Sequence, residues 1–326
     1  MLLEALLYPK FEASQLNVLC HETIEHIKSQ KDNSYVTLSQ NTFKNLFEKH
    51  PYGHWALGKI NSVKSISIKK IRDYYSRVLS NRHFIFSIVG DFEIHDILKL
   101  VKEKFHGISD LYLKPKPFTA PVLKLNRSKT SFEFHHSNNK EQSHIFWGFL
   151  GPSIFDKERT SLEVLSQILS NQSGRLFLDL RDNLSLAYSV SAHQVIFSQS
   201  GVFLIYIATH NDKVFDTLKA LKRLLASIVK TPPSKQDIEK AVKILINNRN
   251  VEEQNYSYQA SQLALSEGYG LKFDNFLAFE KRLKSVNQNS IKRALRSFFI
   301  PKNMFINIVG HKKRQTLNDI KKIIKV

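Results

Sequence analysis

The fold is decided by a pattern that occurs twice in the chain: KSISIKKIRDYYSRVLSNRHFIFSIVGD at Lys64–Asp91 and KSVNQNSIKRALRSFFIPKNMFINIVGH at Lys284–His311. The copies align without a gap, and both open with Lys-Ser and close with Ile-Val-Gly. In each copy a helix N-cap residue, Ser67 or Asn287, precedes an amphipathic helix. A short break then leads to an apolar run that predicts a β-strand. The pattern predicts two homologous α+β domains; two unrelated helix–strand units that agree by chance remain the alternative.

A boundary between the domains is predicted at Gly107–Pro121, GISDLYLKPKPFTAP. Its prolines, Pro115, Pro117 and Pro121, cannot continue a helix and favour a stiff, extended linker. We therefore expect a first domain at residues 1–110, a Pro-rich linker at 111–121 and a second domain at 122–326.

The second domain is the longer one, and its pattern supplies more elements. We expect strands at 130–134, 144–149, 187–195 and 202–209, and helices at 157–171, 175–181, 212–229, 234–255 and 275–283. The first domain shows only a helix at Ala13–Ser29, a loop through Pro51 and the repeat. We therefore expect it to be N-terminally incomplete, without the opening strands of its counterpart.

The composition of the 326-residue chain excludes several classes of protein. Apolar residues make up 42%, which excludes a fully disordered chain, and the single cysteine, Cys20, excludes a disulfide framework. No apolar run is long enough to predict a transmembrane segment, and the N-terminal residues lack the basic region of a cleavable signal peptide. The cytoplasm is then the default compartment. The net charge of +19 comes from scattered Lys and Arg, which favours a solvated basic surface over a specific nucleic-acid site.

Three further motifs carry a family resemblance. They are FEKHPYG at 47–53 with Gly58, FSIVGDF at 86–92, and SGRLF at 173–177 followed by Leu180-Arg181 and by LAYSV at 186–190. With these motifs the chain resembles the pitrilysin/insulinase-type (M16) zinc metallopeptidases over nearly its whole length. The resemblance implies two homologous α/β-sandwich domains. It also implies an activity, the hydrolysis of peptides or proteins by a metal-activated water.

The zinc motif of the active family members, His-x-x-Glu-His, occurs nowhere in this chain. The resemblance implies that Glu22 matches a metal ligand, the third one of the family, while Gln15 stands where a second carboxylate is found. His21 and His26 flank this region, but on a helix they would point about 140° apart and could not bind one metal. Glu22 is therefore either an orphaned ligand or a solvated helix residue. Zinc is the family's cofactor, and we do not expect this chain alone to bind it.

Arg181 and Tyr188 are the candidate catalytic residues. The resemblance implies that this pair holds the substrate backbone and stabilises the tetrahedral intermediate of peptide hydrolysis. A guanidinium and a phenol are suitable hydrogen-bond donors for a developing oxyanion. The alternative is structural: an Arg favoured by a helix C-terminus and a Tyr on a buried strand.

Three functions remain open at this point, and whether the chain is an enzyme stays undecided. The chain could be a non-catalytic subunit that supplies Arg181 and Tyr188 to a second M16 subunit carrying the zinc. It could be a truncated remnant of a one-chain metallopeptidase. As an alternative from another class, it could be a basic protein that reuses the fold to bind polyanions or membrane surfaces.

Overall fold

The computed structural model describes residues 4, 6, 8–80, 84–105, 121–123, 131–136, 141–170, 174–311, 320 and 323. Most of the expected linker lies outside these residues, as do Ser173 and His83. The described part contains both helices and a sheet, which agrees with the expected α+β class.

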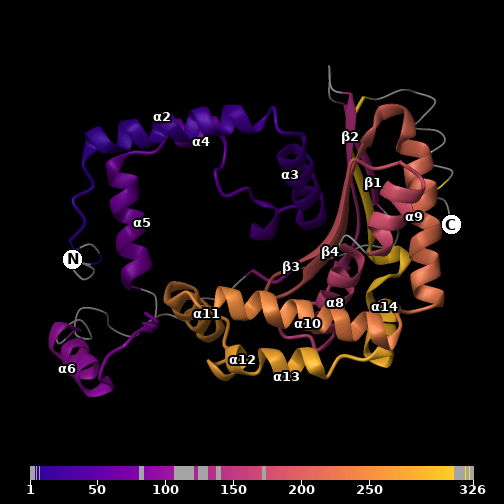
Figure 1. Ribbon diagram of the computed structural model, residues 1–326. Helices are drawn as coiled ribbons and strands as arrows, with labels where there is room; N and C mark the ends of the chain where they lie inside the picture. The colour runs from indigo at the N-terminus through magenta and orange to yellow at the C-terminus, as the bar shows by residue number, and fades with distance from the viewer. Residues whose placement is uncertain are drawn as a thin grey trace.

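In the described residues, one mixed sheet organises the second half of the chain (Figure 1). Its strands lie in the order β1-β5-β2-β4-β3; β1 is parallel to β5, and all other pairs are antiparallel. The strands are β1 (Ser131–His136), β2 (Gln142–Gly151), β3 (Ser189–Ile196), β4 (Gly201–His210) and β5 (Met304–Gly310). The four strands expected between 130 and 209, and the strand of the second repeat copy, are confirmed.

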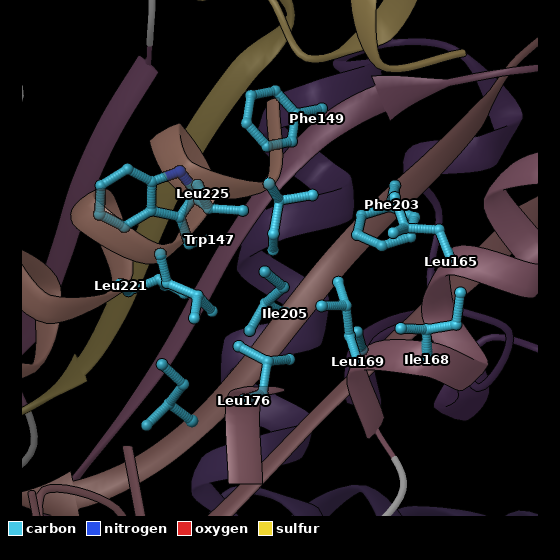
Figure 2. Close-up of a cluster of buried hydrophobic side chains, with 14 of the residues drawn as sticks. Trp147, Phe149, Leu165, Ile168, Leu169, Leu176, Phe203, Ile205, Leu221 and Leu225 are labelled. Atoms are coloured by element: carbon cyan, nitrogen blue, oxygen red, sulfur yellow. The ribbon is translucent and has the colours of Figure 1, made fainter. Parts of the chain in front are cut away.

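One face of the sheet carries the larger hydrophobic core. Ile145, Trp147 and Phe149 alternate along β2 and point toward helices α8 (Glu158–Ser170), α9 (Val214–Lys230) and α14 (Gln288–Phe298). Figure 2 shows the centre of this core, formed by Trp147, Phe149, Leu165, Ile168, Leu169, Leu176, Phe203, Ile205, Leu221 and Leu225. The burial of so many aliphatic and aromatic groups supplies the main driving force for folding here.

The opposite face is covered by α3 (Ser34–Phe47), a helix from the first 110 residues that the sequence analysis did not anticipate. Leu38, Leu46 and Phe47 of α3 share a second buried cluster with residues of β2, β4 and β5, among them Phe146 and Phe305. Because both faces are covered, β2, β4 and β5 are apolar at nearly every position rather than at alternate ones.

A buried polar contact fixes α3 on the sheet. Asn307 of β5 donates from Nδ2 to Oγ1 of Thr42 at 2.9 Å, and both residues are almost fully buried. The side chain of Asn33 caps the first turn of α3 by accepting from the backbone N–H groups of Tyr35 and Val36. Residues 34–47 therefore belong structurally to the sheet of the second half.

In Figure 1 the remaining helices lie to the left of the sheet and below it. They are α2 (Ala13–Gln30), α4 (Ile60–Lys64), α5 (Ile68–Ser80), α6 (Ile94–Phe105), α10 (Lys235–Glu252), α11 (Tyr256–Gly268), α12 (Asp274–Leu277) and α13 (Phe279–Lys284). The helix expected at 234–255 ends at Glu252, because Asn255 starts a new helix as the N-cap of α11. Short helical turns occur at η1 (Pro51–Gly53), η3 (Asn211–Lys213) and η4 (Pro301–Asn303), and a π-helix, η2, at Phe177–Asn183.

The first repeat copy differs from the prediction. Its helix forms as α5, but the expected strand at 84–90 is not a strand: the residues have no regular secondary structure and no sheet pairing. Its apolar side chains, Phe84, Ile85, Phe86 and Ile88, are exposed. Figure 1 shows α5 and α6 on the side of the molecule away from the sheet. The prediction was wrong because a strand needs neighbouring strands, and none lies beside this segment in the described part.

The glycine that closes the second copy is required by packing. A Cβ at Gly310 would overlap the side chain of Ser143 on the neighbouring strand β2. At Gly90, the matching position of the first copy, a Cβ would meet only the Phe92 ring at 3.4 Å, an ordinary contact distance.

Among the helices of the described residues, none combines the length and the apolar character that a bilayer crossing needs.

Candidate functional site

The segment that carries Arg181 is held in place by leucines that pack in the larger core. Leu176 and Leu180 are completely buried in the larger core, and both belong to the SGRLF…LR motif that precedes the site. Arg181 follows directly, and its side chain is exposed. Its guanidinium lies over the Phe177 ring, 4.8 Å from the ring centroid. The motif therefore fixes the backbone of η2 while it presents a cation to solvent.

The loop between Arg181 and Tyr188 is held by backbone hydrogen bonds. The N–H groups of Leu186 and Ala187 donate to the carbonyl oxygen of Leu180 at 2.8 and 3.1 Å. The Leu186 carbonyl in turn accepts from Oγ1 of Thr209 at 2.6 Å. These bonds tie the loop to both η2 and β4, so the two candidate residues are held on a preorganised backbone.

Tyr188 stands at the start of β3, the edge strand of the sheet. Its backbone N–H donates to the Ala208 carbonyl at 2.9 Å, while 57% of the residue is exposed. Strand alternation places Tyr188 on the same sheet face as Val190 and Ala192, which pack against the larger core. The expected structural alternative, a Tyr buried in a strand, is therefore not what the structure shows.

Together, Arg181 and Tyr188 offer two kinds of donor to a bound peptide. The guanidinium supplies up to five N–H donors in a planar fork, and the phenol supplies one O–H donor. Both groups are solvent-accessible and lie close to a sheet edge. Such an arrangement suits the binding of backbone carbonyl oxygens, and it could stabilise negative charge on one of them.

Glu22 lies on a different part of the molecule. It is exposed on α2, a helix with no buried residue, which packs against α4 with Cys20 near the carbonyl of Val63. The neighbouring His26 is exposed as well, and its Nε2 lies 3.2 Å from Nε2 of Gln30. Nearby, the hydrogen bond from Lys28 lowers the pKa of Glu25.

These residues do not fit a catalytic zinc ion, which needs three protein ligands. Within the ranges that the structure describes, no group of three His, Cys, Asp or Glu side chains is close enough to hold a metal. Glu22 and its two neighbouring histidines are spread around a solvated helix.

Glu22 and the Arg181–Tyr188 pair are also separated by the sheet. The η2 segment packs against α9 on the face opposite to α3. Figure 1 shows α9 on one side of the sheet and α2 on the other. The structure therefore places the pair on the face of the sheet opposite to α3, and not toward the helices of residues 1–110.

The HPYG motif at 50–53 has a structural place. The Tyr52 ring stacks on Phe197 with 4.2 Å between ring centroids, and its hydroxyl lies 2.6 Å from Oγ of Ser198 in the β3–β4 turn. His193, on β3, is partly buried, and this burial lowers its pKa. Neither residue adds a polar group to the Arg181–Tyr188 surface.

Sequence reasoning missed the residues that hold the site in position. Thr209 binds the Leu186 carbonyl, and Lys213 donates from Nζ to the Ser185 carbonyl at 2.9 Å. Both follow Tyr188 by more than twenty residues, and only the pairing of β3 with β4 brings them near. A polar Thr at the end of an otherwise apolar strand is the one signal that could have indicated them.

Comparison with known proteins identifies relatives of the whole arrangement. The sequence profile of the "Peptidase M16 inactive domain" matches residues 65–245, which include Arg181 and Tyr188. A zinc protease of Mycobacterium leprae, described as uncharacterized, is 25% identical over 63% of this chain and 46% of its own length. A similarly described protein of Streptomyces coelicolor is 24% identical over 77% of this chain and 55% of its own length. The chain thus spans about half the length of these curated relatives.

Solved structures share the fold. A peptidase M16 inactive domain from Pseudomonas fluorescens superposes with a TM-score of 0.83 at 20% identity, covering 95% of this chain and 73% of that one. A protease from Helicobacter pylori gives a TM-score of 0.79 at 16% identity, covering 92% and 72%.

Proposed function

Since this chain belongs to the M16 peptidase family, we propose that it is the substrate-contacting part of an M16-type peptidase whose metal-binding residues lie on another polypeptide. The curated relatives are named zinc proteases, so zinc belongs to the family's chemistry. The described residues of this chain do not fit that metal, and its own contribution is the Arg181–Tyr188 pair.

The observation that carries the proposal is the presentation of this pair. Two hydrogen-bond donors are exposed at the start of an edge strand, on a loop held to Leu180 and Thr209. The η2 segment packs against α9, and Figure 1 shows α9 on the side of the sheet opposite to α2. A substrate bound there would contact this chain on one side, and the other side of the substrate would be open to a second polypeptide.

In this proposal, the two residues bind and orient the peptide substrate. The Arg181 guanidinium would hold a backbone carbonyl oxygen of the peptide, and the Tyr188 hydroxyl would donate to the carbonyl oxygen that gains negative charge during hydrolysis. Donors that are already in place do not have to reorganise as that charge develops, which lowers the barrier.

The first repeat copy supports a partner of the same family. Its apolar side chains, among them Tyr74, Phe86 and Ile88, are exposed, although the matching residues of the second copy are buried. In the second copy, β5 lies between β1 and β2. A polypeptide that brings strands equivalent to β1 and β2 would cover this surface by the same pairing.

The test is peptide cleavage in a mixture of this chain and an M16 polypeptide that carries His-x-x-Glu-His. We expect cleavage in the mixture and none with this chain alone. Tyr188→Phe should lower turnover by about 10²-fold, the loss typical of one oxyanion donor, with an unchanged melting temperature. Tyr256→Phe is the matched control, because Tyr256 is also 57% exposed but lies on α11.

The opposite pattern would assign the pair a structural role. If Tyr188→Phe lowers the melting temperature while turnover per folded molecule stays at the level of the unchanged chain, the hydroxyl stabilises the fold and does not contact substrate. If no mixture cleaves a peptide that the metal-bearing polypeptide binds, the division of the site between two polypeptides is wrong.

A further inference from the structure

A cavity of about 440 Å³ lies away from Arg181 and Tyr188, between α8, the end of β3 and helices α10 to α13. Its volume is in the range of small-molecule sites in proteins. The lining is unusual in its charge: three arginines from three different helices meet there, Arg159 of α8, Arg249 of α10 and Arg282 of α13.

The hydrogen bonds that the structure gives these arginines leave part of each guanidinium available. Arg159 donates to the carbonyl of Ile154 and to Oδ1 of Asn275, the latter at 2.8 Å. Arg282 donates from one Nη to the Asn275 carbonyl at 2.5 Å. Each guanidinium has five N–H donors. The hydrogen bonds that hold α12 through Asn275 therefore use a minority of the N–H donors of Arg159 and Arg282.

Arg249 is largely enclosed, with 11% of its side chain exposed. It donates to Glu253 at 2.5 Å and to the Tyr258 hydroxyl at 2.8 Å, and it lies over the Phe276 ring at 4.1 Å. Burial is the main reason that the Tyr258 pKa rises to about 12. Aromatic rings thus hold this guanidinium in a fixed orientation within a partly apolar wall.

Negative charge at the cavity does not balance the three cations. Among the described lining residues Glu163 is the one carboxylate, and Glu253, which does not line the cavity, pairs with Arg249. Burial raises the pKa of Glu163, against the opposing effect of all three arginines. Burial also lowers the pKa of Arg282, and the charges of Arg159 and Arg249 lower it further. The arginines therefore repel one another in a site where solvent screens them poorly.

One polar side chain in the cavity wall lacks a hydrogen-bond partner among the described residues. The side-chain amide of Gln194, at the end of β3, is shielded from solvent, and neither its oxygen nor its nitrogen has a hydrogen-bond partner among the described residues. A buried amide without partners is costly, because its lost bonds to water are not replaced. A ligand in the cavity would supply the missing partner.

We propose that this cavity binds an oxyanion group, a phosphate or a carboxylate, held by Arg249 and Arg282 with Gln194 as an additional donor. Arginine forks match the planar carboxylate and the phosphate edge, and such charge-assisted bonds are about twice as strong as neutral ones. The inference does not rest on the proposed peptidase role, because none of these residues belongs to the Arg181–Tyr188 surface.

The test is calorimetric titration of the full chain with pyrophosphate and with a short peptide, in its free-acid and C-terminally amidated forms. We expect the unchanged chain to bind at least one oxyanion probe. Arg282→Gln should weaken that binding by roughly tenfold or more, the loss expected for a hydrogen bond to a charged group. Arg296→Gln, which removes an exposed arginine of α14, is the matched control and should leave the affinity unchanged.

A second variant keeps the test decisive if Arg282→Gln does not fold. Glu163→Gln removes the carboxylate found among the described lining residues and should tighten oxyanion binding several-fold. Binding of pyrophosphate alone identifies a phosphate ligand, and binding of the free-acid but not the amidated peptide identifies a carboxylate. The proposal is overturned if no probe binds at millimolar concentration, or if the two cavity variants and Arg296→Gln all bind as the unchanged chain does.

Discussion

The two repeat copies, Lys64–Asp91 and Lys284–His311, show how far one local pattern can diverge in its surroundings. Ala294 and Ile308 of the second copy are completely buried, whereas the matching residues of the first copy, Tyr74 and Ile88, are 62% and 47% exposed. Both copies form their helix, α5 and α14. Only the second copy forms its strand, β5, which lies between β1 and β2.

The helix of the pattern and the strand of the pattern therefore form under different conditions. A helix satisfies its backbone hydrogen bonds within itself, so α5 can form where its apolar face is poorly covered. A strand cannot, because its N–H and C=O groups need neighbouring strands. The segment 84–90 has the residues of a central strand and no strands beside it in the described part of the chain.

The largest expected consequence is in hydrogen exchange. Amides of 304–310 should exchange only through global opening, whereas those of 84–90 should exchange almost freely, a difference of at least about 10³-fold in protection. Exchange measured by mass spectrometry on peptic fragments tests this. Equal protection of the two segments in the isolated chain would show that 84–90 is already paired, and the two copies would then not differ in this respect.

A matched pair of core substitutions should separate the copies next. Ile308→Ala removes a completely buried side chain from the larger core and should lower the free energy of unfolding by about 2–5 kcal/mol. Ile88→Ala, at the matching exposed position, should change it by less than about 0.5 kcal/mol. Urea denaturation of both variants gives the two values. A loss of comparable size at Ile88 would mean that the first copy is packed in solution.

The buried polar contact of β5 should have an intermediate effect. Asn307→Ala removes the hydrogen bond to Thr42 and leaves that hydroxyl buried without its donor, so about 1–3 kcal/mol should be lost. Ser87→Ala, at the matching position of the first copy, should be nearly neutral. Thermal unfolding followed by circular dichroism distinguishes the outcomes. A neutral Asn307→Ala would indicate that α3 leaves the sheet in solution.

The helix caps should give the smallest difference. Asn287 caps α14 by accepting from the Ser290 N–H at 3.0 Å, and its replacement by Ala should cost about 1 kcal/mol. Ser67 accepts from the Lys70 N–H at 3.3 Å, and Ser67→Ala should cost less, because fraying of α5 disturbs few buried contacts. Denaturation midpoints compared at equal m-values test this. A larger loss at Ser67 than at Asn287 would contradict the view that α5 is the weakly packed helix.

Much of the sheet could be predicted because its strands have a strong local signature. β2 and β4 are apolar runs bounded by turn residues, and the repeat indicated β5. The position of α3 could not be predicted. Its apolar residues indicate that one of its faces is buried but do not specify the surface that buries it. Only the three-dimensional structure shows that they cover the sheet of the second half. The division into domains at residues 1–110 and 122–326 stays a prediction.

The candidate site was predictable in its residues and not in its placement. The motif around Arg181 and Tyr188 is local, so the sequence showed it. The side of the sheet on which the pair lies depends on how distant segments pack. The arginines of the cavity left no pattern at all, because Arg159, Arg249 and Arg282 come from three helices that only the fold brings together.

Replacing the glycine that ends a repeat copy can show whether a neighbouring strand lies beside that copy. At 310 the strand β2 leaves no space for a methyl group, whereas at 90 the same methyl group meets nothing that would exclude it. An alanine at 90 should therefore leave the fold unaffected as long as no strand lies beside the first copy. It becomes a steric block once a neighbouring strand approaches as β2 approaches β5. The alanine substitution at 90 thus distinguishes a chain that functions without a partner from one whose fold is completed by another polypeptide.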